Sequence, residues 1–110
     1  MMKRSLEVLA REQLEKAASA TSGRAAHTVY GGHEHVLRQT LIALTAGQEL
    51  SEHENPGEAT VQVLHGRVQL RAGPNSWEGR RGDLLIVPQL PHSLASIEDS
   101  VVLMTVAKLP

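Results

Sequence analysis

The chain has 110 residues, which leaves room for one domain around a single hydrophobic core. Its 11 lysines and arginines nearly balance its 12 aspartates and glutamates, so the composition excludes the basic surface that nucleic-acid binding requires. The sequence contains no cysteine, which excludes disulfides and thiolate chemistry.

The apolar residues are mostly aliphatic and occur in short runs. With one tryptophan, one tyrosine and no phenylalanine, the core must be filled by valine, leucine, isoleucine and alanine, which favours a β-rich fold. No apolar run is long enough for a signal peptide or a membrane span. We therefore expect a cytoplasmic location and no membrane partner.

The N-terminal segment predicts a short helix over residues 5–18. Its polar face carries Glu, Gln, Lys and Arg, and its narrow apolar stripe consists of Leu6, Leu9, Leu14 and Ala17. Small residues up to position 26 then predict a connector. We expect the helix and connector, residues 1–26, to lie outside a second unit, residues 27–110, or against a partner subunit.

From residue 27 onward, short aliphatic runs alternate with glycine, proline and asparagine turn signals. The runs predict strands over residues 27–30, 35–45, 59–65, 67–72, 76–78, 83–87, 93–97 and 101–107. This many short strands in so short a chain predicts an all-β sandwich or barrel of the jelly-roll kind.

The last predicted strand begins Val101-Val102-Leu103-Met104 and is apolar on both faces. One barrel wall requires only one apolar face, so something else must cover the other. We expect a homodimer, formed through this strand or through the N-terminal segment.

Two histidines stand in frames of glycine and proline. The residues that carry the frames are Gly47, His53 and Gly66 in the first, and Gly82, Pro88 and His92 in the second. In these positions the sequence resembles the cupin superfamily, over roughly residues 40–107. The resemblance implies a single cupin-type jelly-roll β-barrel, with His53 and His92 converging on one pocket.

The sequence departs from the pattern of metal-binding cupins, in which three histidines and a glutamate hold one divalent ion. Asn55 stands at the position of the second histidine, and Ala59 stands at that of the glutamate. Glu58 is one residue off, and on an extended strand that offset turns the side chain to the other face unless a bulge re-aims it. Leu90 and Ser96 replace the glycine and asparagine of the second motif.

We therefore expect a modified metal pocket that holds iron, nickel, zinc or manganese. Candidate ligands are His53, His92, Asn55, Glu58 and His35, and candidate pocket walls are Val61, Val63 and Leu94. His35 belongs to a His-Glu-His run, in which the two imidazoles share a face if the run is a strand. The alternative is a solvated loop.

Two polar positions leave a choice open. Arg38 and Gln39 are adjacent on one predicted strand, so only one of them can line the pocket. By the register that the resemblance implies, Val61 and Val63 face inward and Gln62 faces outward.

Two classes of function fit these residues. Open coordination positions on a bound metal suit a dioxygenase or an isomerase acting on a small molecule, with a histidine moving a proton. The loss of two family ligands instead favours a non-catalytic ligand-binding or sensing barrel without metal. A purely structural barrel and metal-free general-base catalysis are further alternatives.

Overall fold

The computed structural model describes the backbone of residues 2–53 and 57–108, and the side chains of all of these except residues 52 and 53. Over these residues it has one helix, α1 (Leu6–Ser19), followed by nine strands. The strands are β1 (Arg24–Gly31), β2 (Leu37–Leu44), β3 (Glu49–His53), β4 (Gly57–His65), β5 (Arg67–Ala72), β6 (Asn75–Arg80), β7 (Leu84–Val87), β8 (His92–Ser96) and β9 (Ser100–Lys108).

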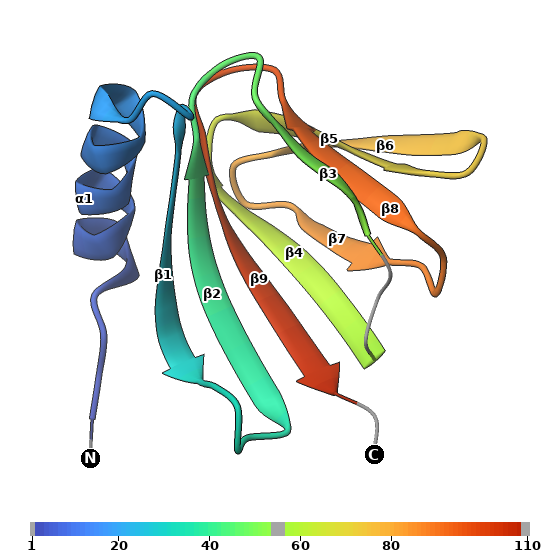
Figure 1. Ribbon diagram of the computed structural model, residues 1–110, viewed down its shortest axis with the longest axis horizontal. Helices are drawn as coiled ribbons and strands as arrows, with labels where there is room; N and C mark the ends of the chain where they lie inside the picture. The colour runs from blue at the N-terminus through green and yellow to red at the C-terminus, as the bar shows by residue number, and fades with distance from the viewer. Residues whose placement is uncertain (1, 54–56, 109–110) are drawn as a thin grey trace.

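The strands form two antiparallel sheets that pack face to face (Figure 1). One sheet has the order β1-β2-β9-β4-β7 and the other has the order β3-β8-β5-β6. The end strands of each sheet have a single hydrogen-bonded neighbour, so the sheets are not closed into a barrel. The predicted all-β jelly-roll with a short N-terminal helix is confirmed, as an open sandwich.

Strand β9 lies at the centre of the larger sheet and is buried on both faces. Partners across antiparallel strands point to the same side of a sheet, and the register pairs Val102 of β9 with Val63 of β4 and Ile42 of β2. These side chains face the other sheet and contribute to the core between the two sheets. The alternate residues of β9, Val101 and Leu103, face outward.

Helix α1 covers the outer face of β1, β2 and β9. The helix begins at its cap Ser5, whose Oγ accepts a hydrogen bond of 3.2 Å from the Val8 amide. Its apolar stripe packs with Leu41 and Ala43 of β2 and with the outward residues of β9. No helix in the described part of the chain is long and apolar enough to cross a membrane.

This packing accounts for the second apolar face of the last strand. Val101 is 1% exposed and Leu103 is 7% exposed, although no partner chain is present. The helix therefore supplies the cover that the sequence required. The homodimer stays a prediction, and the need to cover β9 no longer argues for it.

Two strand assignments from the sequence were wrong. The sequence pattern gave no strand at β3, because Glu49–His53 has a single aliphatic residue, Leu50. β3 is an edge strand that pairs with β8 alone, so its outer face tolerates polar side chains. β1 begins at Arg24, inside the predicted connector, because the small residues that suggest a linker pair in register with β2.

Gly66 lies in the turn between β4 and β5, where the chain passes from one sheet to the other, and it has little free space around it. Its φ is 82°, and an added Cβ would lie 2.8 Å from Ser100 Cα and closer still to the Asp99 carbonyl oxygen. We expect Gly66→Ala to lower the free energy of unfolding by about 2–4 kcal/mol, from backbone strain plus overpacking.

Gly73 supplies the matched control, because its φ is 57° and nothing lies within 4 Å of its added Cβ. Gly73→Ala should cost only about 1 kcal/mol, the strain alone. Urea unfolding of both variants measures the difference, and equal losses would contradict the steric account.

Candidate functional site

Near the end of the larger sheet where β2 begins and β9 ends, the inner face carries a row of four paired residues. The register places them side by side in the order Arg38, Val106, Ala59 and Val87. Val106, Ala59 and Val87 belong to the core, and Arg38 is half-buried. The row therefore consists of one cationic side chain, that of Arg38, beside three apolar side chains.

The structure settles the choice between Arg38 and Gln39. Gln39 lies on the outer face, where its Nε2 donates a hydrogen bond of 3.2 Å to Thr105 Oγ1. Arg38 shares the inner face with Val106. Among the described side chains, the ion pairs within 4.0 Å are those of Arg67, so Arg38 has no carboxylate partner there.

His92 lies on the inner face of the smaller sheet, at the first residue of β8. It pairs with Ala72 and is followed on the same face by the core residue Leu94. Its side chain is 4% exposed, and its Nδ1 lies 3.0 Å from the Leu90 carbonyl oxygen. Because a carbonyl can only accept, Nδ1 carries the proton, and Nε2 is then the unprotonated nitrogen of the neutral ring.

His53 is placed by its backbone alone. It pairs with His92 across β3 and β8, after an irregularity in the register that begins at Leu50. A direct pair puts both Cβ atoms on the same side of the sheet. Asn55 lies outside the described residues.

Two other candidate ligands are not brought to this face. Glu58 is exposed and pairs with Ala107, and the register from Gly57 to Val63 contains no bulge that would re-aim it. Glu58 therefore points away from the space between the sheets. His35 is exposed in the turn between β1 and β2, where its ring contacts Tyr30 edge-on at 5.4 Å between centroids.

The candidate metal ligands whose side chains are described do not by themselves form a metal site. Over residues 2–51 and 57–108, no group of three or more histidines and carboxylates gathers. His92 is the candidate ligand on the inner face whose side chain is described, and Ala59 beside Val106 has no ligating atom. Any metal set depends on His53 and Asn55.

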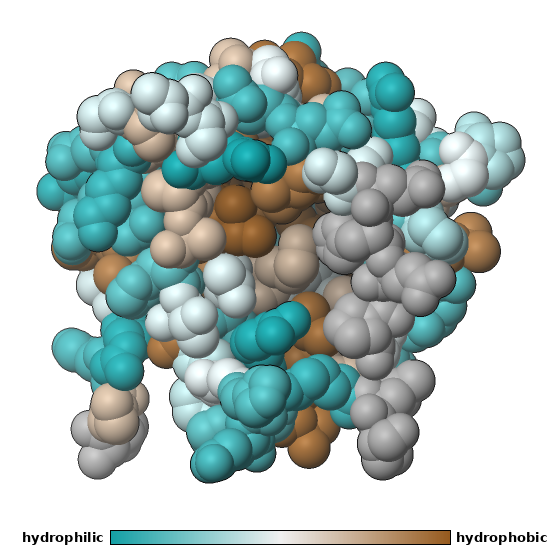
Figure 2. Space-filling model, viewed as in Figure 1, coloured by the Kyte–Doolittle hydropathy of each residue, from teal (hydrophilic) through white to brown (hydrophobic). Residues whose placement is uncertain are grey.

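The three predicted pocket walls are core residues. Val61, Val63 and Leu94 are 1%, 0% and 2% exposed and pack between the sheets. Ile42 and Met104 lie on the same inner face, in the cross-strand rows of Val63 and Val61, and are only partly buried. Figure 2 shows hydrophobic atoms gathered over β2 and β9 and ringed by hydrophilic ones.

Ser96 has a structural role that the sequence did not indicate. It replaces the asparagine of the second motif, and its Oγ lies 2.5 Å from the Thr45 carbonyl oxygen and accepts the Gln48 amide at 3.0 Å. These bonds fasten β8 to the turn that leads into β3.

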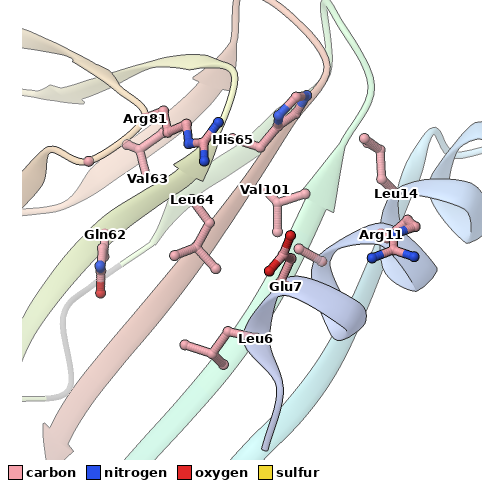
Figure 3. Close-up of a pocket in the computed structure, with 12 residues that line it drawn as sticks. Leu6, Glu7, Arg11, Leu14, Gln62, Val63, Leu64, His65, Arg81 and Val101 are labelled. Atoms are coloured by element: carbon pink, nitrogen blue, oxygen red, sulfur yellow. The ribbon is translucent and has the colours of Figure 1, made fainter.

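Two cavities in the described part of the structure lie on the outer face of the larger sheet. The larger, of about 530 Å³, lies between α1 and β4 and is lined by Leu64 and Val101 (Figure 3). The smaller, of about 330 Å³, lies beside Glu58 and Ile86. Neither cavity lies on the inner face of the smaller sheet, which carries His92.

Comparison with known proteins identifies the fold. No protein-family model matches the sequence, and no curated protein matches it. Among solved structures, a conserved protein of unknown function from Streptococcus pyogenes is 25% identical with a TM-score of 0.74, over 83% of this chain and 79% of that one. An RmlC-like cupin from Desulfovibrio desulfuricans is 24% identical with a TM-score of 0.74, over 97% of each chain.

A salicylate 1,2-dioxygenase from Pseudaminobacter salicylatoxidans also has this fold. It is 20% identical with a TM-score of 0.75, over 91% of this chain and 33% of that one. These likenesses establish the architecture and assign no activity.

The Leu90 contact predicts the tautomer of His92. In long-range ¹H–¹⁵N spectra recorded where the ring is neutral, we expect a protonated Nδ1 and an unprotonated Nε2. His65, which is exposed on β4, serves as the reference ring in the same spectrum. A proton on Nε2 of His92 would contradict the arrangement.

Proposed function

We propose that this chain, which has the cupin fold, binds a small carboxylate at the open end of its two sheets. The observation that carries the proposal is the position of Arg38, a half-buried cation without a described ion-pair partner at the edge of an otherwise apolar row. His92 starts its strand on the inner face of the opposite sheet. In this proposal the ligand lies between these two inner faces.

The chemistry of these groups selects the ligand. A guanidinium donates two parallel hydrogen bonds to a carboxylate, and such charge-assisted bonds strengthen where apolar neighbours lower the local dielectric. The partly buried Ile42 and Met104 suit the apolar body of the same molecule.

A metal-dependent enzyme is the second candidate, a dioxygenase or an isomerase. It is favoured by the backbone pairing of His53 with His92 and by the Leu90 carbonyl, which orients the His92 ring as hydrogen-bond partners behind metal-binding histidines do. Iron, nickel, zinc or manganese would be held by these two histidines with Asn55. A metal held there polarises a substrate oxygen.

Binding of benzoate, with benzamide as its neutral isostere, tests the first candidate. We expect benzoate to shift the methyl signals of Ile42 and Met104, and benzamide to bind weakly. Arg38→Gln should weaken benzoate at least about tenfold, because it removes a charge-assisted bond. Gln39→Ala is the matched control, one residue away on the outer face. Equal affinity for benzamide, or no effect of Arg38→Gln, would refute the proposal.

Metal content tests the second candidate independently. After incubation with iron, nickel, zinc and manganese, elemental mass spectrometry should find near-stoichiometric metal in the wild type and little in His53→Ala/His92→Ala. His35→Ala is the control, because His35 lies exposed in the β1–β2 turn and should leave the content unchanged. Wild-type protein that stays empty would eliminate the metal candidate and leave carboxylate binding standing.

A further inference from the structure

The outer face of the larger sheet carries a groove that the proposed site does not use. The groove runs between α1 and β4 and has a volume of about 530 Å³, within the size range of small-molecule sites (Figure 3). Its apolar floor is formed by Leu6, Ala10, Leu14, Leu64 and Val101. A ligand with an apolar body can bury surface against this floor.

Three cationic or hydrogen-bonding groups reach the rim from three separate elements. Arg11 comes from α1, His65 from the end of β4, and Arg81 from the turn between β6 and β7. Figure 3 shows Arg81 and His65 at one end of the groove and Arg11 across it on the helix. Residues this far apart in sequence meet only because the fold brings them together.

A β-bulge places His65 on the groove side. The pairing of β4 with β9 shifts between Val63 and His65, so His65 stands opposite Val101, which faces α1. Without the shift, Leu64 would stand opposite Val101 and His65 would fall on the inner face with Val63. Bulges commonly re-aim a side chain in this way next to functional sites.

The turn that carries Arg81 is fixed to the sheet. The Gly82 amide donates to the Val63 carbonyl at 2.8 Å, and the Val63 amide donates to the Asp83 carbonyl at 2.9 Å. Within the turn, Asp83 Oδ2 accepts the Arg80 amide at 2.8 Å. The backbone of Arg81 is therefore held at the groove before any ligand arrives, which lowers the entropic cost of binding.

The rim has an excess of positive charge. Two guanidiniums, those of Arg11 and Arg81, face a single lining carboxylate, Glu7. None of these three groups forms an ion pair within 4.0 Å with another described side chain. An anionic head group with an apolar tail complements this combination of floor and rim.

We propose that the groove is a second binding site, for a monocarboxylate with an apolar chain. The carboxylate lies among Arg11, His65 and Arg81, and the chain lies on the floor against Leu64. Such a ligand joins α1 to β4 and to the β6–β7 turn. The site is independent of Arg38 and His92, which lie on inner faces.

Octanoate below its micelle-forming concentration is the probe, with octan-1-ol and octylamine as neutral and cationic controls. We expect saturable amide shifts at Leu64 and Gly82 with octanoate, weaker binding of octan-1-ol and none of octylamine. Arg11→Gln/Arg81→Gln should weaken octanoate about tenfold, because both groups are exposed and partly screened. Lys16→Gln, a charge removed elsewhere on the same helix, should change nothing.

Two further variants locate the bound octanoate. Ala10→Phe fills the floor and should abolish the shifts, and circular dichroism checks that it folds. Arg38→Gln should leave the shifts intact. Each of three results would overturn the proposal. The first is that octanoate gives no amide shifts or non-saturating ones, and the second is that octylamine binds equally well. The third is that Arg38→Gln abolishes the octanoate shifts while Arg11→Gln/Arg81→Gln retains them.

Discussion

The structure depends on the burial of β9 on both of its faces. This strand pairs with β2 on one side and β4 on the other, and its register decides which side chains of both neighbours face inward. Arg38 lies inside and Glu58 outside because each is paired with a residue of known face, Val106 and Ala107 respectively. The outer face of the same strand requires the apolar stripe of α1. The proposed ligand site inside and the groove outside are therefore on opposite faces of one sheet.

Much of this architecture was predictable from the sequence, since burial on one face leaves a period-two pattern and turns leave glycine and proline. The inward register of Val61 and Val63 and the outward position of Gln62 follow the expectation. β3 was not predicted, because an edge strand with one aliphatic residue leaves no such pattern. The placement of α1 against β9 was not predicted either, because an amphipathic pattern indicates that a helix packs on some apolar surface but not on which one.

The candidate site was only partly predictable. The frame around His92 indicated a ring that faces the pocket between the sheets, but not the Leu90 carbonyl that sets its tautomer, because that contact depends on loop geometry. The choice between Arg38 and Gln39 could not be made, since adjacent residues differ only in parity and the parity comes from pairing with β9. The groove rim could not be predicted either, because His65 reaches it through a bulge, and bulges leave little trace in sequence.

The cover that α1 gives to β9 ties folding to contacts between the two ends of the chain. The outer cluster joins residues near position 10 to residues near position 100, so its contacts carry a large loop-closure cost during folding. While these contacts are unformed, the run Val101-Val102-Leu103-Met104 has the composition of an aggregation-prone segment: apolar, uncharged and free of proline. Because α1 covers the outer face of this run in the folded chain, we expect mutations that loosen the helix to promote self-association of the partly folded chain.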